Sequence, residues 1–173
     1  MKSDKFVTST WFLSLLIAVS LIVTVSCKMT VNDPNLSSLD TTNLRIKETK
    51  IIAEIAFTSE EKSKGLAGRK SIPNGTGMLF YYSESTPKGF WMKGMLFSID
   101  IIWIGQNCTI IKIENDVTPP SSINDKLKIY PAPALTGAVL ELNSGQAALL
   151  ELNIGDRVVY EPSKMGRSLT CSE

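Results

Sequence analysis

The stretch that most constrains the fold is residues 77–105, GMLFYYSESTPKGFWMKGMLFSIDIIWIG. It contains three short apolar runs, at residues 78–82, 90–92 and 99–104. Apolar runs of this length, separated by Ser, Pro, Gly and Lys residues, are typical of buried strands rather than helices. Lys93 directly follows the second run and Asp100 lies inside the third, so either the strands alternate faces or charged groups are buried with them. We therefore expect a small β core with a polar cluster in it.

Composition limits the classes of function. The 173 residues suffice for one domain with a real core, and 43% hydrophobic with 20% charged residues argues against disorder. A net charge of +1 gives no reason to expect nucleic acid as a partner. The chain has no histidine, which excludes Ser-His-Asp and Cys-His catalysis and every metal site that needs His. Nothing in the sequence indicates a cofactor.

The N-terminus has the features of a targeting segment. Lys2 and Lys5 precede an apolar run at residues 11–25, which is short for a membrane span and is followed by the small Ser26 and then Cys27. This resembles a bacterial lipoprotein signal, although Thr24 stands where leucine is usual. The resemblance implies a signal peptide at residues 1–26, lipidation of Cys27, and an exported protein anchored to a membrane of the cell envelope, on its periplasmic or outer surface. A secretory signal cleaved nearby and an uncleaved anchor remain as alternatives.

The rest of the chain divides into three parts. Residues 27–44 are rich in Ser, Thr, Asn and Asp, which predicts a flexible tether, with an ordered arm as the alternative. Residues 45–162 are expected to form one domain. Residues 163–173 are polar and are expected to be a disordered tail.

Local patterns predict the elements of the domain. Thr58 and Glu61 have capping-box spacing and start a short helix that runs to about Leu66. Further strands are expected at residues 50–56, 109–113, 138–142 and 157–160, and a second short helix at residues 146–152. The Pro-rich residues 116–133 are expected to form a long unpaired loop, which is either a candidate lid or a plain surface loop. The fold class is therefore α+β, mostly β, with a compact mixed sheet or small barrel-like domain.

Several motifs occur together in the order found in one known family. They are Gly65-Leu66, Arg69, GMLF at residues 77–80, FWMK at residues 90–93, Asp100, LEL at residues 140–142 and Gly155-Asp156. In this respect the chain resembles DUF192, a prokaryotic family of unknown function, over about residues 51–159. Gly94 and Ser98 depart from the family pattern, which commonly has asparagine and proline there. The resemblance implies a compact β-rich α+β domain, often exported, and supplies no reaction.

The candidate site residues are Arg69, Trp91, Lys93, Asp100 and Glu141. If Arg69 and Lys93 are drawn to the two carboxylates, they form a partly buried cluster that is either structural or a ligand site. A ligand site should place Trp91, Lys93 and Glu141 in one pocket, with part of residues 116–130 at its rim. No metal site is predicted, because no calcium-loop spacing is present.

Three functions remain open at this point. The favoured one is an envelope-anchored binding or accessory module for a small polar, anionic or carbohydrate molecule, or for an envelope protein. The second is a glycosidase-like hydrolase with Asp100 and Glu141 as its acid and base. The third is a purely structural or interaction protein. The sequence favours binding over catalysis, and it leaves open whether Cys108 and Cys171 pair.

Overall fold

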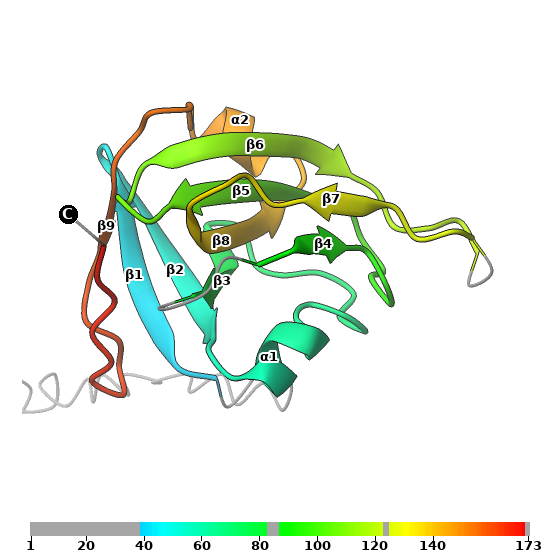
Figure 1. Ribbon diagram of the computed structural model, residues 1–173, viewed down its shortest axis with the longest axis horizontal. Helices are drawn as coiled ribbons and strands as arrows, with labels where there is room; N and C mark the ends of the chain where they lie inside the picture. Colours follow the sequence, from blue (N-terminus) through cyan, green and yellow to red (C-terminus); the bar gives the residue numbers. More distant parts are fainter. Residues whose placement is uncertain (1–38, 83–86, 123–124, 172–173) are drawn as a thin grey trace, which may run out of the picture. The chain divides into compact units, whose positions relative to one another are not determined.

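The computed structural model describes residues 39–82, 87–122 and 125–171 (Figure 1). The expected signal peptide, Cys27 and most of the expected tether lie outside these ranges. Among the helices that it does describe, none has the length and apolar character to cross a membrane.

Within the described ranges the chain forms nine strands and two short helices. In chain order they are β1 (Thr41–Ile46), β2 (Thr49–Ala56), α1 (Ser59–Lys64), β3 (Thr76–Tyr81), β4 (Gly89–Trp91), β5 (Ile99–Gly105), β6 (Ile110–Val117), β7 (Ile129–Pro131), β8 (Thr136–Asn143), α2 (Gln146–Leu149) and β9 (Val158–Tyr160). All three apolar runs of residues 77–105 form strands, as predicted.

Seven of the strands form one mixed sheet in the order β6-β5-β8-β3-β2-β1-β9, which curls into a half-barrel (Figure 1). The two edge strands approach each other at one end, where Thr109 and Arg157 form an isolated antiparallel bridge. The short strands β4 and β7 pair separately as a second small sheet. The predicted α+β, mostly β fold class is confirmed.

The central strands β3, β5 and β8 are buried on both faces. Leu79, Ile102 and Leu140 belong to a core cluster on one face, whereas Met78 and Ile101 belong to a second cluster on the other. Strand side chains alternate between faces, so a strand covered on both sides needs an unbroken apolar run. This explains why residues 99–104 show no polar alternation apart from Asp100.

The connection between β2 and β3 carries α1 because these two strands are parallel. Thr58 and Glu61 form the predicted capping box: the Thr58 hydroxyl accepts the Glu61 N–H, and the Glu61 carboxylate accepts the Thr58 N–H. Gly65 ends the helix with φ at +49°. A Cβ added at this position would lie 3.2 Å from the Phe80 ring. Glycine therefore both ends α1 and lets it sit close to β3.

Two predicted unpaired segments contain strands. β1 begins at Thr41, inside the expected tether, and it buries Leu44 and Ile46 against β2 and β9. Its polar residues predicted a tether, but two buried apolar side chains and two strand partners suffice to order it. β7 lies inside the expected proline-rich loop, and Tyr130 pairs with Phe90 of β4. Proline is tolerated there because β7 is an edge strand.

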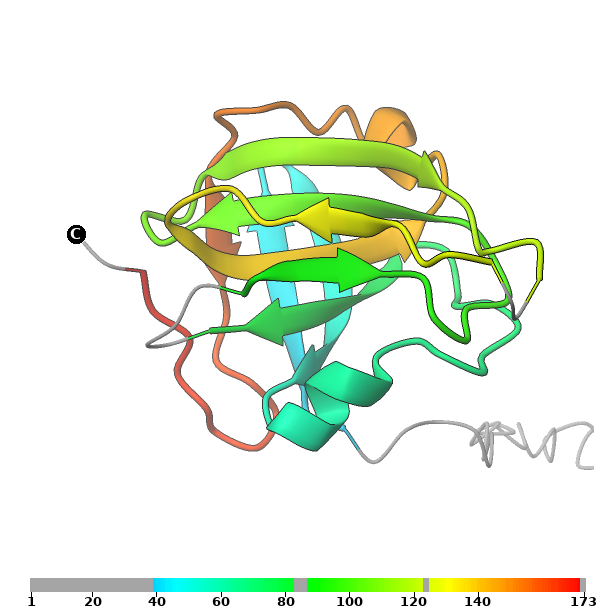
Figure 2. The same ribbon diagram turned by 45° about the vertical axis from the view of Figure 1, so that its right-hand side comes forward.

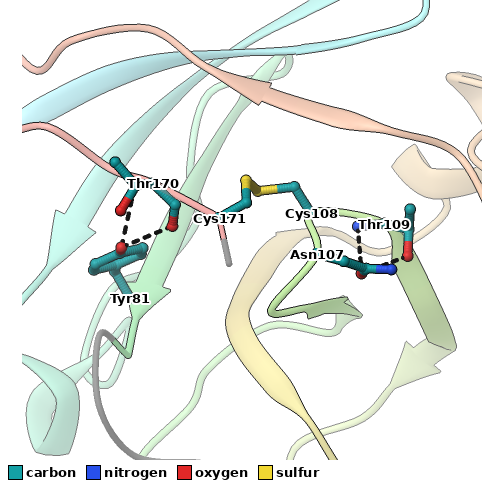
Figure 3. Close-up of a disulfide and its surroundings, with 6 residues drawn as sticks. All are labelled: Tyr81, Asn107, Cys108, Thr109, Thr170 and Cys171. Carbon is teal, nitrogen blue, oxygen red and sulfur yellow. Dashed lines mark hydrogen bonds between the residues drawn. A yellow bond between two sulfur atoms is a disulfide. The ribbon is translucent and has the colours of Figure 1, made fainter. Parts of the chain in front are cut away.

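The C-terminal segment packs on the sheet, at least as far as Cys171, where a disordered tail was expected. Leu169 is buried in the first core cluster, and the Tyr81 hydroxyl donates to the Thr170 carbonyl at 3.0 Å. Cys171 forms a disulfide with Cys108, with 5.5 Å between the two Cα atoms (Figure 3). The pairing that the sequence left open is therefore made, and it ties the segment to the turn before β6.

Candidate functional site

A hollow in the described part of the domain lies between α1, the end of β3, and β4 with its flanks, on the face of the sheet that carries the second core cluster. Figures 1 and 2 both show α1 beneath β3 and β4. The volume of the cavity is about 420 Å³. This lies at the lower end of the range for small-molecule sites, so it fits a ligand smaller than a typical drug.

Glu141 is a buried acidic residue that lines the cavity. It lies near the middle of β8, between β3 and β5, and only 5% of its surface is exposed. Its carboxyl has no hydrogen bond or salt bridge among the described residues, although it lines the cavity. Burial raises the pKa of Glu141 to about 8, because no donor or positive charge lies close enough to its carboxyl to offset the loss of hydration.

Lysines surround the same cavity. Four of them line it: Lys62, Lys64, Lys88 and Lys93. None of the four takes part in a salt bridge within the described ranges, whose ion pairs use other cations. Their ammonium groups give the cavity a positive field that attracts anions.

Aromatic side chains form much of the cavity wall: Phe80, Tyr82, Phe90 and Trp91. Trp91 is half exposed, whereas Phe90 is buried and packs edge-on against Trp103. The Lys62 ammonium lies 4.3 Å from the centre of the Tyr82 ring, and desolvation lowers the pKa of Lys62. Desolvation, followed by the nearby Glu141 carboxyl, raises the pKa of Tyr82 to about 12. Lys62, Tyr82 and Glu141 are thus electrostatically linked neighbours.

The predicted cluster of Arg69 and Lys93 with two carboxylates does not form. Arg69 binds Glu54 instead, donating from its two terminal guanidinium nitrogens to the two carboxylate oxygens at 2.8 and 2.7 Å. Asp100 is fully buried and accepts the backbone N–H groups of Asp116 and Ala147 at 3.0 and 2.9 Å. Backbone donors therefore take the place of the cation that the sequence led us to expect.

Three predicted site residues do meet in one place. Trp91, Lys93 and Glu141 line the cavity together, whereas Arg69 and Asp100 do not. The proline-rich loop does not form its rim as predicted; residues 118–121 and 125–128 line a separate cavity of about 210 Å³ next to Tyr130. Sequence reasoning missed Lys62, Lys64 and Lys88. The signal for Lys62 was its position one helical turn after Ser59 on α1, which places both on one helix face.

No group of three or more carboxylate or thiol side chains lies close enough together to hold a metal ion in the described part of the chain. Asp156, the acid of the Gly155-Asp156 motif, accepts the Asn153 N–H and pairs with Lys47 at 2.8 Å. The hydrogen bond from Lys47 is the largest of the effects that lower the pKa of Asp156.

Comparison with known proteins identifies one family and two similar structures. The family model DUF192, described as an uncharacterised ACR, matches residues 42–160. A protein of unknown function from Novosphingobium aromaticivorans DSM 12444 has a similar structure, with a TM-score of 0.63 and 30% identity over 72% of this chain and 89% of that one. A Sinorhizobium meliloti 1021 protein, described as a candidate transcription regulator, has a TM-score of 0.61 and 25% identity over 72% and 96%. No curated protein matches the chain significantly.

Proposed function

The chain belongs to the DUF192 family, which carries no assigned activity, and we propose from its own geometry that the domain binds a small molecule with an anionic group and an apolar body. One observation carries this proposal: a single cavity of about 420 Å³ joins aromatic walls, four lysines without salt bridges among the described residues, and the buried Glu141. Apolar walls with a few converging polar groups are the usual composition of a ligand site.

The charges of the cavity indicate the sign of the ligand. Like charges that share a cavity repel, and an anion among the lysines relieves that repulsion while gaining charge-assisted hydrogen bonds. Lys88 and Lys93 are exposed, and they lie just before and just after β4 in the chain. They are therefore placed to receive an anion that enters from solvent. The buried Phe80 and Phe90 offer contact to the apolar part of the ligand.

Binding is better supported than glycoside hydrolysis. A pair of carboxylates that acts as acid and base must flank one bond. Glu141 reaches the cavity, but Asp100 is fully buried elsewhere and both of its oxygens accept backbone N–H groups. The two acids therefore do not form a catalytic pair for one substrate.

The test is a titration of the protein with propionate and with ethyl phosphate, in which the NMR chemical shifts of the backbone amides are measured at each ligand concentration. We expect saturable shifts around α1 and β4 for at least one of these anions. Lys93→Ala should weaken the affinity about tenfold, the scale of one charge-assisted hydrogen bond. Lys70→Ala is the matched control, because Lys70 is exposed and does not line the cavity. If neither anion shifts these residues, the cavity is structural and the proposal fails.

We also propose that the domain is exported and anchored through a lipid on Cys27, so that it acts at a membrane of the cell envelope. The Cys108–Cys171 disulfide supports export, because such bonds persist in oxidising compartments. Cys27 itself lies outside the described residues. Mass spectrometry of the mature N-terminus tests this proposal: a diacylated Cys27 is expected, and an unmodified terminus at another residue would reject the anchor.

A further inference from the structure

Glu141 is a buried carboxyl that opens into the cavity without a partner of its own. It is 95% buried, since 5% of its surface is exposed, and no described residue hydrogen-bonds to its carboxyl oxygens. Removing a carboxyl from water without replacing its hydrogen bonds is costly, so such groups are normally paired. The missing partner is the feature that a ligand can supply.

The same face of the sheet shows which partner a partly buried glutamate takes here. Glu54, Met78 and Glu141 are paired in register across β2, β3 and β8, so their side chains lie in one row on one face. Glu54 receives a cation, the Arg69 guanidinium, through two hydrogen bonds of 2.8 and 2.7 Å. Glu141, two strands away in that row, has the open cavity where Glu54 has Arg69.

We propose that the ligand is a zwitterion, whose primary ammonium group pairs with Glu141 while its anionic group binds the lysines. This inference rests on the proposed function and deepens it by naming the ligand class, small amino-carboxylates or amino-phosphates. The ammonium group takes the role at Glu141 that the Arg69 guanidinium has at Glu54.

The chemistry of the cavity favours an ammonium group over a neutral donor. Hydrogen bonds between two charged groups are about twice as strong as neutral ones. The exposed ring of Trp91, which also lines the cavity, adds a face on which a cation is stabilised. The lysines repel a cation that arrives alone, so the anionic end of the same molecule is needed to offset them.

Pairing with an ammonium group changes the protonation of Glu141. Burial keeps its carboxyl protonated at pH 7 in the empty cavity, so ion pairing releases one proton to the solvent. The other titratable groups that line the cavity are Tyr82, Lys62, Lys64, Lys88 and Lys93, from the end of β3, from α1 and from the flanks of β4. An anion that binds these lysines favours their protonated forms, so the lysines contribute no release.

Calorimetric titration of the full chain at pH 7 with two matched pairs tests the proposal: β-alanine against propionate, and phosphoethanolamine against ethyl phosphate. The amine-bearing member of at least one pair should bind about tenfold more tightly, and the pair that responds identifies carboxylate or phosphate as the anionic end. Repeating the titration in two buffers of different ionisation enthalpy should give close to one proton released. Glu141→Gln should abolish both the preference and the release.

Failure of this inference is distinguishable from failure of the proposed function. If both members of each pair bind equally and no proton is released, the zwitterion is rejected and an anion site remains. If no member of either pair binds, the site itself is rejected. The matched pairs are compared on the wild-type chain, so the outcome does not depend on whether Glu141→Gln folds.

Discussion

The carboxyl groups of Asp100 and Glu141 lie on neighbouring strands but on opposite faces of the sheet. Asp100 pairs in register with Leu142, and Glu141 pairs with Ile101. Leu142 belongs to the core cluster on one face and Ile101 to the cluster on the other, so the two acids that look alike in the sequence enter different environments. Asp100 joins backbone segments, whereas Glu141 faces the cavity.

The first prediction concerns Asp100 as a structural acceptor. Asp100→Ala removes the acceptors of two N–H groups, at Asp116 and at Ala147, and the Ala147 bond is buried. We expect a loss of about 3 kcal/mol in the free energy of unfolding, because each unmade buried hydrogen bond costs about 1–3 kcal/mol. Denaturant melts measure it. Asp125→Ala, at an exposed turn, is the control and should change stability by less than about 0.5 kcal/mol. A native-like melt for Asp100→Ala would contradict the structural role.

The second prediction concerns the pH dependence that Glu141 imposes. Its pKa is raised from 4.5 to about 8 by burial, so between these values the folded state holds a proton that the unfolded state has lost. The free energy of unfolding therefore falls as pH rises through this window, by up to about 1.4 kcal/mol per pH unit, and levels off above it. The chain has no histidine, so no other side chain of ordinary pKa titrates between pH 5 and 8.

Melts from pH 5 to pH 9 measure this slope. Glu141→Gln should remove it, because the amide is neutral at every pH and has nearly the same shape. Glu60→Gln on the exposed surface of α1 is the control and should keep it. A wild-type stability that stays flat or rises from pH 5 to pH 8 would show that the carboxyl is ionised in the folded state.

The third prediction concerns the Arg69–Glu54 pair. The two side chains are only 24% and 21% exposed and make two parallel hydrogen bonds, so Arg69→Ala leaves a partly buried carboxylate without its cation. We expect a loss of about 2 kcal/mol, and Arg69→Lys should recover only part of it, because a lysine cannot donate through a planar fork. Lys112→Ala is the control. Its partner Glu114 lies in a more exposed pair, where about 0.5 kcal/mol is expected. Equal effects at the two sites would argue against the bidentate pair.

The fourth prediction concerns the disulfide. Cys108 and Cys171 are separated by 63 residues, for which the loss of chain entropy in the unfolded state corresponds to about 4 kcal/mol. Dithiothreitol should lower the unfolding midpoint of the wild-type chain. It should also speed up trypsin cleavage after Lys164, an exposed residue in the segment that the disulfide holds. The double variant Cys108→Ser with Cys171→Ser should have a lower unfolding midpoint, and the reductant should not change it. A wild-type midpoint that is unchanged by reductant would show that the bond is absent or does not stabilise the fold.

Local patterns determined most of the elements. Thr58 and Glu61 start α1 because the capping box needs only residues three apart, and it forms as predicted. The apolar run at residues 99–104 forms β5, because a strand buried on both faces must be apolar throughout. The mostly β class follows from such runs together with the glycines and prolines between them, all of which can be read over a few residues.

Contacts between distant segments decided the partners of the charged and half-polar residues. Glu54 and Arg69 meet because the parallel β2–α1–β3 crossover returns the chain to the same face, and no spacing rule in the sequence encodes that pairing. β1 is ordered by its neighbours β2 and β9, the latter from the other end of the chain.

The sequence by itself determined that Trp91, Lys93 and Glu141 were candidates for one pocket, because charged residues beside apolar runs are unusual. Only the tertiary structure decided that Lys62 joins them and that Asp100 does not. The physical reason is that strand alternation assigns each residue to a face, but the register between strands and the path of the crossover decide which faces meet. Those depend on packing across the whole sheet, which no local pattern contains.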